Sequence, residues 1–249
     1  ISIGIFTACI VFPVSILLEG SLTKIERSRI FVIYIIAFFV IFFWAAYEQA
    51  GASLTLFAAE QTDRFVLGWE VPASWIQSFN PFFVVILAAI MPGIWGFLNK
   101  RDAEPASPTK QAIGLLLLSL GYLVICFGVK DTQPGVKVSL IWLTGLYFIH
   151  TVGELCLSPI GLSMVNKLTP LRFASLMMGI WYLSMSTANK FAGTLSGLYP
   201  EDGKVKTLLG FRIETMFDFF MVFVIMSGVA SLILFLLSKK LQKMMHGVE

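Results

Sequence analysis

The segment "FFWAAYEQAGASLTLFAAE", residues 42–60, places a carboxylate and an amide, Glu48 and Gln49, inside a run of apolar side chains. Such a run predicts a membrane helix, because about 20 mostly apolar residues are needed to cross the hydrocarbon core of a bilayer. An ionisable group at that depth is costly and normally faces a cavity or a charged partner. Glu48 is therefore the first candidate for a functional residue.

The whole chain has the composition of a membrane protein. Hydrophobic residues make up 57% of its 249 residues and charged residues 13%, whereas soluble domains contain about 45–50% and about 25%. The net charge of +3 is too small to indicate a nucleic-acid partner. Cys9, Cys126 and Cys156 lie in apolar runs without a CxxC pair or a Cys/His cluster, so we expect no disulfide framework and no metal site. The chain opens without Met in an apolar stretch, and we expect it to be part of a longer protein.

Hydropathy predicts an all-α membrane protein in which a bundle of six transmembrane helices covers residues 21–249. Helix-start signals support the first two helices, because Thr23 with Glu26 and Ser74 with Gln77 have the spacing of a capping box. The predicted spans are residues 30–59, 75–98, 111–129, 139–166, 171–198 and 212–238.

Lysine and arginine are unevenly distributed between the two ends of these spans. Cytoplasmic loops of membrane proteins carry an excess of these residues, so the richer end is predicted to lie in the cytoplasm. With an even number of spans, both ends of the chain lie there too. The richer end carries Lys24, Arg27, Arg29, Lys100, Arg101, Lys110, Lys167, Arg172, Lys239, Lys240 and Lys243, and the opposite loops carry Arg64, Lys130, Lys137, Lys204, Lys206 and Arg212.

Charged side chains away from the ends of the predicted spans are rare, and they are Glu48, Glu154 and Lys190. Charged groups at this depth normally face the interior of a bundle or a water-filled cavity. Polar residues recur every three or four positions around them, so we expect three polar helix faces to meet at one aqueous cavity. These faces comprise Trp44, Glu48 and Thr55; Tyr147, Thr151, Glu154 and Ser158; and Ser184, Thr187, Lys190 and Thr194.

Each of these features also has a purely structural interpretation. The two carboxylates could belong to a buried network in which Lys190 neutralises one of them. His150 lies one turn before Glu154 on the same helix face, yet such a histidine is more often a hydrogen-bonded packing residue than a proton relay. Trp44 and Trp181 would ordinarily be packing or interfacial aromatics.

Longer motifs resemble helices of the proton-dependent oligopeptide transporter family, within the major facilitator superfamily. The resemblance runs in order from about residue 21 to 238, and it implies that the chain is the C-terminal half of a twelve-helix transporter. Residues 1–20 then resemble the tail of a linker helix between the halves. The motifs are "FFWAAYEQAGASLTLFA" (42–58) for the seventh helix, "SFNPFF" (78–83) for the eighth, and "HTVGELCLSPIGLSMVNKLTP" (150–170), "RFASLMMGIWYLS" (172–184) and "ANKFAG" (188–193) for the tenth and eleventh.

The resemblance implies a carrier and not an enzyme. Its members import di- and tripeptides by alternating access, coupled to proton entry, so protons are the coupling ion and no cofactor is expected. The partners implied are peptides, the lipid bilayer and an N-terminal six-helix half, with no nucleic acid. The implied location is the inner cell membrane.

Functional positions of the family match individual residues of this chain. Glu48 resembles the seventh-helix carboxylate that pairs with a first-helix arginine near the outer gate, and Glu60 could join a second outer-gate pair. Glu154 resembles the tenth-helix carboxylate of substrate binding and of an inner salt bridge. Asn80 resembles the eighth-helix asparagine that binds the peptide. Residues at positions that line side-chain pockets are Trp44, Trp181, Tyr182 and Ser184.

One departure concerns the first-helix motif E-x-x-E-R, which this chain lacks; "KIERSR" (24–29) is read as a loop. The cationic partners of both carboxylates are therefore outside the chain, and this half alone is not expected to transport. Three other interpretations stay open: another major-facilitator carrier for nitrate, drugs or sugars, an intramembrane enzyme, and a structural membrane subunit. The enzyme is disfavoured because His150 stands alone without metal-ligand spacing.

Overall fold

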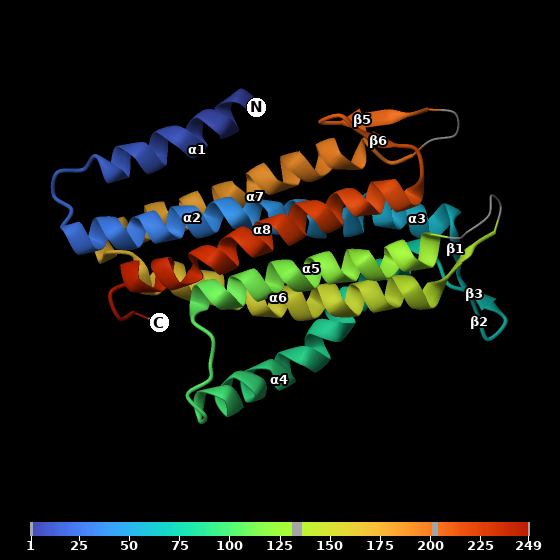
Figure 1. Cartoon of the computed structure of the whole chain (residues 1–249), viewed down its shortest axis with the longest axis horizontal. Coiled ribbons are helices and arrows are strands. Elements are labelled where there is room, and N and C mark those ends of the chain that lie inside the picture. Colours follow the sequence, from blue (N-terminus) through green and yellow to red (C-terminus); the bar gives the residue numbers. More distant parts are fainter. Residues whose placement is uncertain (1, 131–135, 201–203, 249) are drawn as a thin grey trace.

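The computed structural model describes residues 2–130, 136–200 and 204–248. Long helices lie side by side and make up most of the fold (Figure 1). They are α1 (Ser2–Leu17), α2 (Lys24–Tyr47), α3 (Ser53–Glu60), α4 (Phe79–Asn99), α5 (Ser107–Val129), α6 (Leu140–Leu168), α7 (Ala174–Ser196) and α8 (Met216–Met244). Three 3₁₀ turns, η1 (Glu48–Gly51), η2 (Ala73–Ser78) and η3 (Leu171–Phe173), adjoin them.

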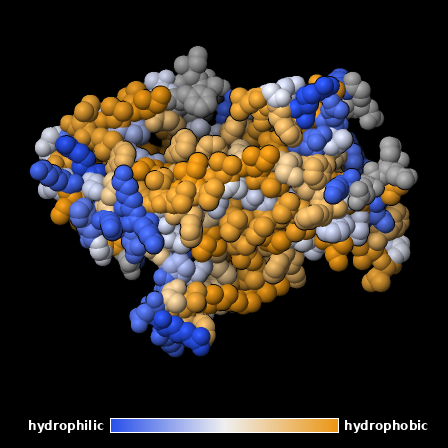
Figure 2. Space-filling model, in the orientation of Figure 1, coloured by the Kyte–Doolittle hydropathy of each residue, from blue (hydrophilic) through white to orange (hydrophobic). Residues whose placement is uncertain are grey.

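Five segments of the described chain are long and apolar enough to cross a membrane. Figure 2 shows the corresponding surface, which is apolar along the middle of the molecule and hydrophilic toward the ends. The prediction of an all-α membrane protein is confirmed, whereas the sixth span stays a prediction, because α7 does not meet the same criterion. The five segments are Lys24–Glu60, Ala73–Asn99, Ser107–Val129, Leu140–Leu168 and Met216–Met244.

The core of the bundle forms around α5, which packs against α6 on one side and α8 on the other. Fully buried aromatic rings fill the α5–α8 contact, with Tyr122 stacked on Phe223 at 4.8 Å between ring centroids. On the other side the helices approach closely, because Gly114 and Gly153 face each other without side chains. A second pair, α2 with α7, packs beside this core.

The first predicted span, 30–59, is divided in two. Helix α2 ends at Tyr47, η1 follows, and Ala52 takes the non-helical angles φ −128° and ψ −102° before α3 begins. The interruption is held by Gln49, which is completely buried and donates to the carbonyls of Ala45 and Ala192 at 3.2 and 3.0 Å. The predicted regular polar face of this span is therefore wrong beyond Tyr47.

One of the two capping boxes predicted from the sequence is present in the structure. The predicted capping box of α2 is confirmed, with Thr23 and Glu26 bonded reciprocally. Residues 24–29 form the first turns of α2, so the interpretation of "KIERSR" as a loop is wrong. The second predicted box is wrong, because the chain there enters η2 from Pro72 and no side chain caps it. Gln77 instead donates to the Thr55 hydroxyl at 2.8 Å, which ties η2 to α3.

Within the described residues, three small two-stranded sheets lie at one end of the bundle, where the sequence predicted loops (Figure 1). Two are hairpins whose tips, Leu67-Gly68 and Leu209-Gly210, have positive φ at both residues, as type I′ turns require. The third is a parallel pair that joins the end of α3 to the start of α6. The strand pairs are β1 (Thr62–Asp63) with β4 (Val138–Ser139), β2 (Phe65–Val66) with β3 (Trp69–Glu70), and β5 (Lys206–Leu208) with β6 (Phe211–Ile213).

The opposite end of the bundle gathers the α1–α2 turn, the α4–α5 connection and the C-terminus (Figure 1). Basic side chains fasten these segments together. The guanidinium of Arg29 donates to the carbonyls of Met245 and His246 at 3.1 and 3.3 Å, and Arg172 bonds the Ser21 carbonyl at 2.9 Å. The loops thus group as the sequence predicted, while the side of the membrane on which they lie stays a prediction.

Candidate functional site

A polar cluster joins three helices in the middle of the fold. The Tyr47 hydroxyl of α2 donates to Oε2 of Glu154 on α6 at 2.5 Å. Asn80 of α4 donates from Nδ2 to the same carboxylate oxygen at 2.9 Å, and it also contacts the Tyr47 hydroxyl. The Thr151 hydroxyl, one turn before Glu154, lies 3.2 Å from Nδ2 of Asn80. We refer to Tyr47, Asn80, Thr151 and Glu154 as the polar cluster.

Aromatic packing fixes the position of Tyr47. Its ring stacks on the buried ring of Phe43, with centroids 5.4 Å apart and an interplanar angle of 19°. Trp44 meets the same ring edge-on at 5.3 Å. Because the ring is held from two sides, the hydroxyl is directed toward α6 before any ligand binds.

Asn80 lies in the first turn of α4, where the chain leaves η2. The adjacent Phe79 packs edge-on against the ring of Tyr147 on α6, with centroids 6.2 Å apart. This contact holds the start of α4 against α6 and brings the Asn80 amide to the carboxylate. Two residues predicted for substrate binding, Asn80 and Glu154, are thus adjacent in the structure.

The Glu154 carboxylate is half-buried and has no cationic neighbour bonded to it among the described residues. Both of its protein donors bind Oε2, and no hydrogen bond of the described chain involves Oε1. The side-chain carbonyl of Asn80 is likewise without a bonded donor there. Anions held by neutral donors alone attract a cation, so the polar cluster is suited to bind an ammonium group.

Glu48 follows Tyr47 directly in the chain and begins η1. Its side chain is exposed, and its carboxylate forms no ion pair within the described residues. Lys190 is also exposed and is bonded to neither carboxylate there. The structural interpretation in which Lys190 neutralises one of the acids is therefore not what the described chain adopts.

His150 is a packing residue. It is 3% exposed, its Nε2 lies 3.1 Å from the carbonyl oxygen of Leu118, and its ring packs against that of Tyr122 at 4.8 Å. Only a glycine at position 121 leaves room for this ring, since a Cβ there would lie 2.3 Å from the imidazole. His150 thus fastens α5 to α6, as the simpler interpretation of the sequence predicted.

The residues predicted to line side-chain pockets are dispersed. Trp44 is half-buried against Tyr47, whereas Trp181 is 2% exposed and is packed over Gly161. Ser184 is buried and donates to the Trp181 carbonyl at 2.6 Å, and Tyr182 is exposed on another face of α7. Of these four residues, Trp44 has a ring contact with the polar cluster.

Glu60, predicted to act at an outer gate, is the last residue of α3. It is exposed, and its carboxylate accepts a hydrogen bond from the Tyr199 hydroxyl at 3.2 Å. Burial and the neighbouring carboxylate raise the pKa of the Tyr199 phenol. Tyr199 therefore stays a neutral donor that ties α3 to the segment after α7.

Two residues of this region were missed by sequence reasoning. Tyr47 is one aromatic among many in its segment, although it lies three residues after Trp44 and so shares its helix face. In the sequence, Gln49 stands out only as a polar residue beside Glu48. Its burial and its bonds to α7 could be found only in three dimensions.

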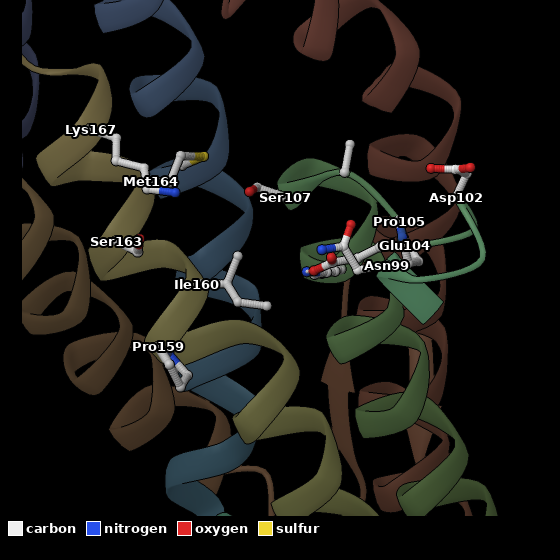
Figure 3. A pocket seen from close by; sticks show the side chains of 12 residues that line it. Asn99, Asp102, Glu104, Pro105, Ser107, Pro159, Ile160, Ser163, Met164 and Lys167 are labelled. Atoms are coloured by element: carbon white, nitrogen blue, oxygen red, sulfur yellow. Dashed lines mark hydrogen bonds and ion pairs between the residues drawn. The ribbon is translucent and has the colours of Figure 1, made fainter. Parts of the chain in front are cut away.

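A separate hollow of about 650 Å³ lies between the α4–α5 connection and the C-terminal half of α6 (Figure 3). Lys110 borders it and forms an ion pair with Glu104. None of the predicted site residues lines this hollow. Its lining is mixed in charge and includes Asn99, Asp102, Ser107, Ser163 and Lys167.

The profile of the POT family matches residues 5–211 of this chain. The chain belongs to the POT family. It is similar to the peptide transporter YePEPT of Yersinia enterocolitica, with 37% identity over 74% of the chain and 36% of the relative. It is also similar to dipeptide and tripeptide permease A of Escherichia coli, with 30% identity over 88% of the chain and 43% of the relative.

The fold agrees with that assignment. The crystal structure of a mutant of the peptide transporter POT in complex with alafosfalin matches 98% of this chain, with a TM-score of 0.86 and 31% identity, and the match covers 47% of that structure. The chain therefore spans less than half the length of the relatives it matches. It is a multi-pass membrane protein of a transporter family.

Proposed function

We propose that this chain is the C-terminal half of a carrier that imports di- and tripeptides together with protons by alternating access. The observation that carries the proposal is the polar cluster, in which Glu154 is held by Tyr47 and Asn80 and has no bonded cation among the residues that the structure describes. A free peptide supplies such a cation in its N-terminal ammonium. Dipeptide and tripeptide permeases among the relatives favour this substrate class.

In the proposed binding step, Glu154 and Asn80 hold the peptide ammonium. The peptide carboxylate needs cations or dipoles, which the N-terminal six-helix half supplies. Side chains of the peptide are received by pockets to which Trp44, Trp181, Tyr182 and Ser184 contribute after rearrangement of α7. Trp181 and Ser184 are buried in the present conformation, so this part requires movement.

In the proposed coupling step, Glu48 carries the proton. Its carboxylate is exposed at the break between α2 and α3, where a change in helix packing alters its environment. Burial disfavours a charged carboxylate and a neighbouring cation favours it. Alternation between these environments lets Glu48 take a proton on one side and release it on the other, while Glu60 acts at the outer gate.

The driving force suffices for accumulation. One proton that crosses a membrane potential of about 100 mV releases roughly 2.3 kcal/mol. Since each 1.4 kcal/mol or so corresponds to a factor of about ten, the potential alone supports roughly fifty-fold accumulation. One carboxylate that moves one proton per peptide is therefore enough.

The assembly and location belong to the same proposal. The N-terminal half packs against the inner faces of this bundle, and residues 1–20 are the tail of the linker between the halves. The transporter lies in the inner membrane of a bacterial cell, with both ends of this chain in the cytoplasm. The bacterial relatives and the excess of basic residues at one end support this placement.

The proposal is tested with the full-length protein in liposomes. An inward proton gradient should drive uptake of a labelled dipeptide, and unlabelled di- and tripeptides should compete whereas nitrate and sugars should not. Glu48→Gln should abolish driven uptake while exchange of labelled for unlabelled peptide persists. Glu19→Gln, which changes an exposed carboxylate in the α1–α2 turn, is the matched control and should behave as wild type.

Each arm of that experiment can contradict the proposal. Competition by nitrate or sugars in place of peptides would assign the chain to another carrier class. Unchanged driven uptake in Glu48→Gln would remove Glu48 from the coupling step. Absence of any uptake by the wild type would favour a structural subunit.

A further inference from the structure

We propose that Tyr47 is a positioning residue of the substrate site, whose hydroxyl fixes the Glu154 carboxylate so that one oxygen is reserved for the peptide ammonium. This inference rests on the proposed function. It concerns a residue that neither the motif nor its spacing singled out, and it follows from the division of hydrogen bonds within the polar cluster.

The two oxygens of the Glu154 carboxylate are not equivalent. Oε2 accepts from the Tyr47 hydroxyl at 2.5 Å and from the Asn80 amide at 2.9 Å. A carboxylate oxygen offers about two acceptor positions, and these two donors are placed to fill both. Oε1 has no donor within the described chain and keeps both of its positions for a ligand.

Asn80 alone cannot impose this arrangement. Its amide nitrogen carries two hydrogens but faces three acceptors, namely the Tyr47 hydroxyl, the Thr151 hydroxyl and Glu154. At least one of these contacts is therefore unfilled at any moment. The Tyr47 hydroxyl has a single hydrogen, and Glu154 is the acceptor to which it is directed.

The Tyr47 ring is rigid enough for a positioning role. Phe43 stacks on one face of it and Trp44 closes one edge. The hydroxyl therefore reaches Glu154 without the loss of side-chain freedom that a long flexible donor would incur on binding. A carboxylate held in this way is preorganised for its ligand, and preorganisation raises affinity by reducing the cost of ordering.

The consequence is selective. Loss of the Tyr47 hydroxyl should weaken binding of the peptide ammonium group and leave the rest of the site intact. Tyr47→Phe keeps the ring and its packing and removes one oxygen atom. Tyr34→Phe is the matched control, since Tyr34 also lies on α2 and its hydroxyl contacts the sulfur of Met177, away from the polar cluster.

The test compares the wild type, Tyr47→Phe and Tyr34→Phe of the full-length protein in liposomes. Uptake of labelled dialanine gives KM and the maximal rate, and competition by dialanine and N-acetyl-dialanine measures the contribution of the free ammonium. In Tyr47→Phe we expect KM to rise about tenfold, the effect of losing one hydrogen bond to a charged group, with the maximal rate within about twofold. The preference for dialanine over its acetylated form should fall by a similar factor of about ten.

Three results would overturn the inference. The first is a KM in Tyr47→Phe within twofold of the wild-type value. The second is an equal loss of affinity for dialanine and N-acetyl-dialanine, which indicates a merely structural defect. Failure of the wild type to take up dialanine would overturn the proposed function and this role with it, whereas the first two results leave that function intact. The rise in melting temperature that dialanine produces in each purified variant measures binding directly. The inference can therefore be tested even for a variant whose transport is too slow to measure.

Discussion

At the residue scale, the neighbours Glu48 and Gln49 have opposite environments. Glu48 is exposed, and Gln49 is completely buried. Consecutive side chains of a 3₁₀ turn point about 120° apart, so these two neighbours face different surroundings. Gln49 donates to Ala45 and Ala192 and accepts from the Ser53 hydroxyl at 2.6 Å. The Gln49 amide stabilises the helix break, whereas the Glu48 carboxylate is exposed to changes in its environment.

This contrast predicts different effects of two substitutions. Gln49→Leu should destabilise the full-length protein by about 2 kcal/mol, because it removes the hydrogen bond from η1 to the α7 backbone and leaves the buried Ser53 hydroxyl without its acceptor. Glu48→Gln should leave stability within about 0.5 kcal/mol, as is usual for exposed positions. Thermal unfolding in detergent measures both. Equal melting temperatures for the two variants would contradict the assignment of Gln49 as the structural residue.

Sequence reasoning found the acid and amide of the polar cluster but not the phenol. Glu154 stands out because charged groups are rare in apolar spans, whereas Asn80 is implied by the resemblance of "SFNPFF" to the eighth helix of the family. Tyr47 lies in an aromatic-rich stretch where nothing distinguishes it, and its partners are 33 and 107 residues away in the chain. Such a role becomes visible only when the helices are placed in space, and so does the burial of Trp181.

At the element scale, the contact between α5 and α6 depends on the absence of side chains. A Cβ on Gly114 would lie 2.8 Å from the backbone carbonyl of Gly153, which cannot move independently of its helix. The buried Gln111 of α5 adds a hydrogen bond to the Leu157 carbonyl at 2.9 Å. Small residues that permit close approach are the usual basis of helix packing in membranes.

Gly114→Ala should therefore force α5 and α6 apart. Overpacking of this kind costs about 1–3 kcal/mol, and we expect a lower melting temperature and lower yield of folded protein. Gly145→Ala on α6 is the matched control, because its Cβ would meet Val124 at an ordinary distance of 3.5 Å. Fluorescence-detected size-exclusion chromatography after heating compares the two. A Gly114→Ala variant as stable as the control would contradict the close approach.

Sequence patterns located most helices but not their interruptions. Helix α5 covers the predicted span 111–129 and begins four residues earlier, because hydropathy marks the apolar part of a helix and not its polar first turn. No proline in the sequence marks the helix break after Tyr47. The break depends on the buried hydrogen bonds of Gln49. The hairpins escaped prediction because Leu-Gly is an unusual type I′ turn, for which Asn-Gly is the common signal.

At the scale of the whole molecule, the bundle has two chemically different ends and one incompletely covered helix. Among the residues of α4, only Leu87 and Met91 are buried, and α4 diverges from the other helices toward its C-terminus (Figure 1). Because most side chains of this apolar helix are not buried by the described chain, the helix needs lipid or another helix bundle beside it. The proposed N-terminal half supplies that neighbour, which agrees with the share of the relatives that this chain spans.

Exposed residues at the two ends of the molecule provide a test of how it lies in the membrane. Leu67 and Leu209 are fully exposed at the two hairpin tips, and Asp102 is exposed in the α4–α5 connection at the opposite end. If the basic end is cytoplasmic, a membrane-impermeant maleimide should label Leu67→Cys and Leu209→Cys in intact cells. Asp102→Cys should react only after the cells are permeabilised.

That experiment uses the full-length transporter with its native cysteines replaced, so that each variant carries one thiol. Retained dipeptide uptake serves as the control for folding. The excess of lysine and arginine at one end predicts this orientation, since such residues are retained on the cytoplasmic side during insertion. Labelling of Asp102→Cys in intact cells, with protection of both hairpin tips, would reverse the orientation. It would also move the entry side of the Glu48 proton to the opposite face of the membrane.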